Sequence, residues 1–130
     1  MRSEIKVHEY VVKYRELYQA LRPIYSPAIG EKVYFGMAGF KHLMFKGGHR
    51  RDTANIIGRL ILIPLIPPVI KGCYEEIEIR IRREMIDGHK VKVTYYALEA
   101  HVGKDSVKVR VITRKVGEKG RHYFQSVMKY

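Results

Sequence analysis

The last third of the chain carries side chains of the types that cleave RNA without a metal ion. Within residues 91–129 stand a carboxylate, two arginines and a histidine: Glu99, Arg110, Arg114 and His122. In such cleavage one group takes the 2′-hydroxyl proton, a second protonates the leaving oxygen, and fixed cations stabilise the charged phosphorane. We therefore treat these four residues as catalytic candidates. Lys108 is a further candidate for phosphate binding, because it stands close to both arginines in the sequence.

Strands joined by glycine-containing turns must position these side chains. From residue 74 onward apolar and charged residues alternate, which is typical of a strand with one buried face. Asp87 and Gly88 both tolerate positive φ, so they predict a two-residue hairpin turn. The predicted register places Ile81 opposite Thr94, Ile79 opposite Tyr96 and Ile77 opposite Leu98.

A second tight turn is expected at Gly103-Lys104, which places Leu98 beside Val109 and Glu99 beside Lys108. We expect helices to cover the apolar face and leave the charged face open. The first register also brings Glu76 opposite Glu99, and two close carboxylates raise one pKa, as a general base working near neutral pH requires.

The loop between Arg114 and His122 leaves two registers open for the last hairpin. A three-residue loop at 117–119 places His122 beside Arg114 and Ser126 beside Arg110, on the charged face. A four-residue loop through Gly120 turns both residues inward. A catalytic role for His122 favours the first register, because an acid must lie within hydrogen-bond reach of the substrate.

Residues 1–70 are expected to be mainly helical. Ser3 can cap a first helix that ends before Pro23, and Phe40–Lys46 predicts a short second helix with His42 and Lys46 on one face. A third helix is expected from Asp52 or Thr53 to the residue before Pro64. The sequence predicts one α+β domain over residues 1–130: helices over about 1–70, then a four-stranded antiparallel sheet over about 74–129.

Composition favours a polyanionic partner. Twenty-five Lys and Arg against 13 Asp and Glu give a formal charge of +12, which suits phosphate neutralisation. The run 60–70 is apolar but short and holds three prolines, so we expect a buried connector and no membrane partner. The single Cys73 excludes an intrachain disulfide and a Cys-rich zinc site, and fits the cytoplasm. No zinc-ligand spacing occurs, so neither metal nor cofactor is expected.

Four segments occur in a distinctive order: Lys41-His42-Leu43 with Lys46, residues 96–100 (YALEA), residues 109–112 (VRVI) and residues 122–127 (HYFQSV). Together they resemble the phage-type branch of the superfamily that unites barnase, EndoU, the RNase-type colicins and RelE. The resemblance covers roughly residues 31–129. It implies helices followed by a four-stranded sheet, and metal-independent nuclease activity, usually on RNA, in toxins or phage conflict systems.

The resemblance also implies roles for particular residues. In the barnase-like pattern a strand Glu is the base, two Arg four apart hold phosphate and a later His is the acid, which matches Glu99, Arg110, Arg114 and His122 in type and order. His42 becomes a second acid or base candidate, and Lys46 a phosphate contact. The further binding candidates are Arg51, in the charge run after Lys46, and Ser126.

The sequence thus favours a metal-independent endoribonuclease, with either Glu99 or His42 as the base. Its partners would be RNA and an acidic inhibitor protein, since such an enzyme harms its host. Two alternatives stay open. One is a non-catalytic RNA-binding domain that stacks bases on Tyr95, Tyr96 and Phe124. The other is a phage structural module without activity.

Overall fold

The computed structural model describes residues 2–75 and 78–130 and has the α+β architecture expected from the sequence. Helices come first, and a six-stranded mixed sheet in the order β1-β2-β8-β7-β6-β5 follows. The helical elements are α1 (Arg2–Gln19), α2 (Met37–His42), α3 (Thr53–Leu60), the 3-10 helix η1 (Ile63–Leu65) and α4 (Ile66–Gly72). The sheet strands are β1 (Ile24–Ser26), β2 (Glu31–Tyr34), β5 (Glu78–Ile86), β6 (His89–Val102), β7 (Val107–Val116) and β8 (His122–Lys129), and β3 (Phe45–Lys46) with β4 (His49–Arg50) forms a separate hairpin.

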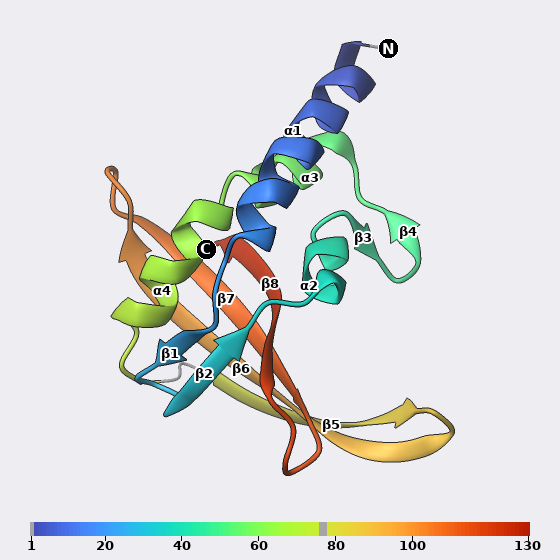
Figure 1. The fold of residues 1–130 in the computed structure, drawn as a ribbon, viewed down its shortest axis with the longest axis vertical. Helices are drawn as coiled ribbons and strands as arrows, with labels where there is room; N and C mark the ends of the chain where they lie inside the picture. The colour runs from blue at the N-terminus through green and yellow to red at the C-terminus, as the bar shows by residue number, and fades with distance from the viewer. Residues whose placement is uncertain (1, 76–77) are drawn as a thin grey trace.

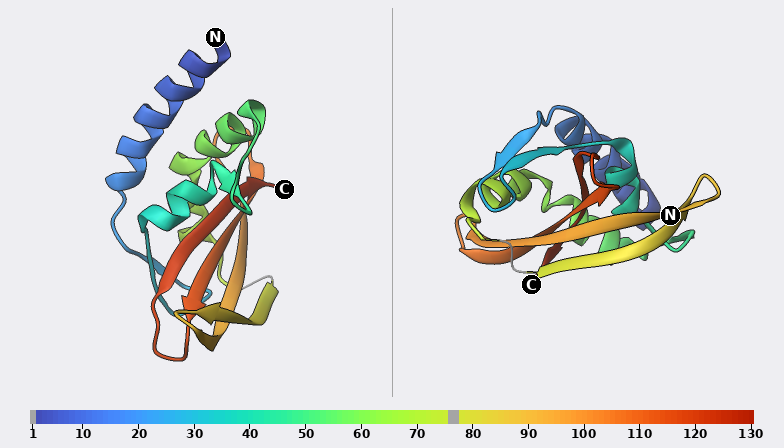
Figure 2. Two further views of the ribbon diagram at one scale, coloured as in Figure 1. Left: turned by 90° about the vertical axis from the view of Figure 1, so that its right-hand side faces the viewer. Right: turned by 90° about the horizontal axis from the view of Figure 1, so that it is seen from below.

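The helices gather on one side of the long strands (Figures 1 and 2). They bury the sheet face that carries Leu98, Val109 and Val111, all fully buried. This is the face that the sequence predicted to be covered. Two strands beyond the predicted four, β1 and β2, extend the sheet at β8, where β2 pairs parallel to β8.

Local sequence explains where the helices begin and end. The predicted cap of the first helix, Ser3, does not lie at the cap position, because α1 begins at Arg2. The Asp52 carboxylate accepts a 2.8 Å hydrogen bond from the Asn55 amide and caps α3, as expected for this residue type. The second helix ends at His42, so Lys46 lies on β3 and not on the predicted common helix face.

The apolar run after α3 is partly helical. Residues Thr53–Gly72 have a mean hydropathy of 1.7 over a length that could cross a membrane. In the structure this stretch is divided into α3, η1 and α4, with Pro64 at the start of η1. Ile66, Val69 and Ile70 of α4 are buried in the core against the sheet. The connector expected here is therefore buried, but it contains a helix, α4, which the sequence did not predict because of its prolines.

The β5–β6 hairpin forms in the predicted register, with Ile81 opposite Thr94. Asp87 and Gly88 both take positive φ, as their turn requires. The burial expected on β5 was wrong, however, because Ile81 is 60% exposed and Ile79 is also exposed. The strand lies at the sheet edge, and the hairpin runs out beyond the helices (Figure 1). The predicted position of Glu76 and Ile77 lies outside the described residues.

The β6–β7 register is shifted by two residues from the prediction. The connection is a four-residue loop, Gly103–Ser106, in which Ser106 takes a positive φ of 49°. Leu98 therefore pairs with Val111, and Glu99 pairs with Arg110. A shift of two leaves every side chain on its predicted face, so the apolar and charged faces still coincide.

The last hairpin does not adopt the register that a catalytic His122 requires. His122 pairs with Lys115, on the core face, and not with Arg114. An irregularity of the bulge type between Ile112 and Thr113 then changes the alternation along β8, so that Ser126 pairs with Ile112 and returns to the charged face. The predicted placement was thus wrong for His122 and, for Ser126, right in face but not in partner.

Candidate functional site

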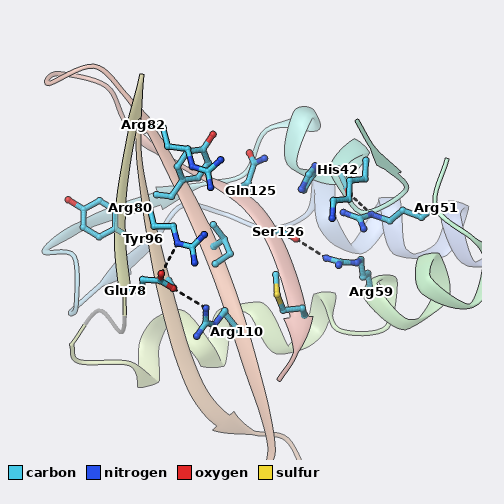
Figure 3. Close-up of a pocket in the computed structure, with 15 residues that line it drawn as sticks. His42, Arg51, Arg59, Glu78, Arg80, Arg82, Tyr96, Arg110, Gln125 and Ser126 are labelled. Carbon is cyan, nitrogen blue, oxygen red and sulfur yellow. Dashed lines mark hydrogen bonds and ion pairs between the residues drawn. The ribbon is translucent and has the colours of Figure 1, made fainter. Parts of the chain in front are cut away.

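A cleft of about 460 Å³ opens between the charged face of the sheet and the segment α2–β3–β4–α3. Figure 3 shows arginines from both sides facing it, with Gln125 and Ser126 of β8 between them. Six Lys and Arg side chains line the cleft against one carboxylate, that of Glu78. The cleft therefore has a strongly positive wall, which attracts anions.

One side of the cleft is formed by His42, Lys46, Arg51 and Arg59, which we call the helix-side cluster. Arg51 donates from Nε to the carbonyl oxygen of His42 at 3.1 Å, which holds the guanidinium at the C-terminal end of α2. Arg59 donates from Nη1 to Ser126 Oγ at 2.9 Å and to the Val127 carbonyl at 3.2 Å. The Arg51 bond thus ties the segment after β4 to the end of α2, and the Arg59 bonds tie α3 to β8.

A close approach of α2 to β8 helps to place His42. Gly39 is buried against Phe124, and a Cβ at this position would lie 2.8 Å from the Phe124 ring carbon Cδ2. A side chain there would push α2 outward. The glycine thus permits the distance at which the helix end reaches the cleft.

In the part of the chain that the structure describes, the charge of the helix-side cluster is not neutralised by a carboxylate. Among the described residues, no Asp or Glu oxygen lies within ion-pairing distance of these four side chains. Burial lowers the pKa of His42, and the charges of Arg51 and Arg59 lower it further. Burial also lowers the pKa of Arg59, with a contribution from Arg51. Mutual repulsion of this kind is relieved by a bound anion.

On the sheet, three arginines pair with carboxylates: Arg80 and Arg110, which line the cleft, and Arg114, which lines the adjoining hollow. We call these three the sheet-side arginines. Arg82 of β5 also lines the cleft and has no ion pair among the described residues. Arg80 lies 2.6 Å from Glu78, and Arg114 lies 3.0 Å from Glu84. Arg110 binds Glu99 through two nitrogens and also lies 3.4 Å from Glu78.

Glu99 is held in an ion pair and does not line the cleft. Its side chain is 8% exposed and contacts Arg110 and, at 3.3 Å, Lys108. Burial acts to raise the pKa of Glu99, but hydrogen bonds from both cations outweigh burial and lower the pKa. The sequence predicted a raised pKa for Glu99, as a general base requires, and among the residues that the structure describes this prediction is wrong.

His122 lies on the other side of the sheet, away from Arg110 and Arg114. It is 1% exposed, and its Nε2 lies 2.6 Å from a Glu31 carboxylate oxygen. The Tyr96 ring packs edge-on against the imidazole, with centroids 5.1 Å apart. The His122–Glu31 contact therefore links β8 to β2.

The cleft brings together five of the nine candidates from sequence. Arg114 lines the adjoining hollow together with His42. Of the three residues expected to stack bases, Phe124 is buried, and Tyr95 and Tyr96 line the cleft, although the Tyr96 ring points away from it in Figure 3. The five lining candidates are His42, Lys46, Arg51, Arg110 and Ser126.

Sequence reasoning missed Arg59, Arg80, Arg82 and Gln125, which all line the cleft. Arg80 and Arg82 alternate on β5 with the period that was recognised, so their shared face with Glu99 could have been inferred. Arg59 gives a weaker signal, the Asn55–Arg59 spacing of four on a helix, which the structure uses for a 2.8 Å hydrogen bond. No local signal brings Arg59 to Ser126.

Comparison of the chain with known protein families, curated protein sequences and solved structures gives no match. The resemblance of its motifs to the ribonuclease superfamily therefore stays a prediction. Among residues 2–75 and 78–130, no group of three or more His, Cys, Asp or Glu side chains is placed to hold a metal ion.

Proposed function

We propose that the cleft binds the phosphodiester backbone of RNA and that the protein cleaves it without a metal ion, with His42 as general base. The observation that carries this proposal is the helix-side cluster, an imidazole beside three cations that lack carboxylate partners among the described residues. Arginine and lysine in such a site bind phosphate.

The electrostatics of His42 fit the role of a base. A lowered pKa leaves the imidazole neutral near pH 7, so it can accept a proton from a 2′-hydroxyl. The resulting alkoxide attacks phosphorus, the bond to the 5′ oxygen breaks, and that oxygen takes a proton from solvent. Arg51, Arg59 and Lys46 are the cations that would stabilise the charged phosphorane.

A non-catalytic RNA-binding role is the second candidate. It is favoured by the separation of the predicted acid and base, because Glu99 is ion-paired outside the cleft and His122 is buried on the opposite face. In this alternative the cleft retains RNA through the same cations and releases it unchanged.

One assay separates the two candidates. Purified protein is incubated with mixed-sequence RNA in excess EDTA, and the products are resolved by electrophoresis. The proposal expects fragments that end in a cyclic phosphate or its hydrolysis product. A substrate with a 2′-deoxynucleotide at the scissile position should stay intact, because the internal nucleophile is missing. Binding of intact RNA without fragments would support the second candidate instead.

An acidic inhibitor protein would fit the same cleft, because its carboxylates could pair with the cations that have no carboxylate partner among residues 2–75 and 78–130. We include this partner in the proposal. Co-purification of the protein with such an inhibitor, and loss of RNA binding in that complex, would test it.

A further inference from the structure

The cleft continues along β8 as a longer trough. A second hollow shares His42, Tyr95 and Gln125 with the cleft, and a third shares Arg114 and Gln125 with the second. The three hollows have volumes of about 460, 380 and 440 Å³. Because each shares lining residues with the next, they adjoin one another, from the hollow lined by Arg59 to the hollow lined by Arg121.

The bulge in the β7–β8 pairing explains why Gln125 lies among these hollows. The register skips Gln125 between Phe124 and Ser126, so its side chain is released from the regular alternation. It lines all three hollows. Bulges commonly re-aim a side chain toward a site in this way.

The far end of the trough carries an aromatic and cationic surface. Tyr123 pairs with Arg114 on the charged face and is 44% exposed. Its ring lies 5.9 Å from the ring of Tyr34, at an interplanar angle of 43°. The guanidinium carbon of Arg121 lies 4.6 Å from the centroid of the Tyr34 ring. An exposed ring beside a planar cation offers stacking surfaces for a flat, electron-rich group.

We propose that Tyr123, with Tyr34 and Arg121, forms a stacking subsite for a nucleobase of an RNA strand whose backbone is bound at the helix-side cluster. This subsite rests on the proposed function. It is separate from the cluster, since neither tyrosine nor Arg121 lines the cleft itself. A base that stacks on Tyr123 must be unpaired, so the preferred substrate is a single strand long enough to reach from His42 to Tyr123.

Binding of oligoribonucleotides of increasing length tests the subsite. The probes are a fluorescent dinucleotide and a fluorescent octanucleotide, both with methylated 2′-hydroxyls so that they cannot be cleaved. Wild-type protein should bind the octanucleotide more tightly. Tyr123→Leu should weaken octanucleotide binding by about fivefold to a hundredfold, the effect of losing one stacked base, and leave dinucleotide binding unchanged.

Three further variants make the test specific. Tyr123→Phe keeps the ring and should keep the affinity. Tyr25→Leu removes an exposed tyrosine on β1, which lines a different hollow, and should bind like wild type. Arg121→Ala changes an exposed side chain with little risk to folding and should weaken octanucleotide binding several-fold.

The outcomes separate the subsite from the function. Equal octanucleotide binding by wild type and Tyr123→Leu, with dinucleotide binding intact, would overturn the subsite and leave the proposed function standing. Tighter binding of a duplex than of the single strand would also overturn it. Absence of binding to both probes in the wild type would overturn the proposed function together with the subsite.

Discussion

The helix-side cluster and the three sheet-side arginines differ in whether a carboxylate pairs with the guanidinium, and Arg82 is the exception on the sheet, because it has no ion pair among the described residues. Each sheet-side arginine has a carboxylate within 3.4 Å, and the pKa values of Glu78, Glu84 and Glu99 are lowered. In the helix-side cluster, Arg51 and Arg59 are held by hydrogen bonds to carbonyl, amide and hydroxyl oxygens, which position the guanidinium without cancelling its charge. Among the described residues, countercharge and not the number of arginines distinguishes the two groups, and this difference is the basis for our proposal that phosphate binds at the helix-side cluster.

The largest expected effect concerns His42, which the sequence ranked second to His122 as the catalytic imidazole. His42→Ala should lower RNA cleavage by about a hundredfold or more, the usual loss for a general base. RNA affinity should change little, because the three cations beside His42 remain. The rate is measured in single-turnover cleavage in EDTA. His8→Ala, at an exposed position on α1, is the matched control.

His122 provides the contrasting outcome. His122→Gln should destabilise the fold, since the imidazole is buried beside Glu31 and Tyr96, while cleavage per folded molecule should stay near that of the wild type. A loss of cleavage in folded His122→Gln with normal cleavage in His42→Ala would reverse our assignment.

The second prediction separates the two kinds of arginine by stability. Arg110→Ala should lower the free energy of unfolding by about 2 kcal/mol, because it leaves the nearly buried Glu99 carboxylate with Lys108 as its remaining partner. Arg51→Ala should change it by less than about 0.5 kcal/mol, since the lost hydrogen bond is offset by relief of repulsion with Arg59. Urea unfolding of both variants measures the difference, and equal losses would remove the distinction between the two sides.

The third prediction tests which side contacts phosphate. Each single-strand phosphate contact contributes about −0.7 to the slope of log affinity against log salt concentration. Lys46→Ala should therefore make the slope shallower by about 0.7, because this exposed lysine has no carboxylate partner among the described residues. Arg80→Ala should change it less, since Glu78 already neutralises Arg80. A larger change for Arg80 would move the phosphate path to the sheet.

The sequence predicted the faces of the sheet better than the position of the site. Period-two alternation and the Asp87-Gly88 turn determined the β5–β6 register, because hairpin register follows from local turn chemistry. Ser106 with positive φ has no comparable sequence signature, so the second register shifted. The sequence left two loop lengths open before His122, and the structure has the register that pairs His122 with Lys115 and turns it inward. The bulge at Gln125, which also lacks a sequence signature, then returned Ser126 to the charged face.

The helix-side cluster illustrates the same limit. His42, Lys46 and Arg51 are close in sequence and were selected together, although the helical spacing assigned to the first two was wrong. Arg59 joins them through Ser126, a contact between residues 67 positions apart. Such a contact depends on tertiary packing, which no local pattern encodes.

The smallest expected effect is the pH dependence that His42 gives to stability and binding. Its pKa in the folded protein is below the ordinary value of 6.5, so the unfolded chain binds more protons as the pH falls below that value. Protonation therefore destabilises the wild type from about pH 6.5 downward, through the lowered pKa, and His42→Gln should lose less stability over this range. Thermal melting across the range measures the difference.

Inorganic phosphate bound at the helix-side cluster should raise the pKa of His42, because it supplies the missing negative charge. Titration of the imidazole signals by NMR, with and without phosphate, distinguishes His42 from the other histidines once these signals are assigned. An unchanged His42 pKa in saturating phosphate would mean that the anion binds elsewhere, and would remove the electrostatic contrast between the two sides of the cleft as an explanation for function.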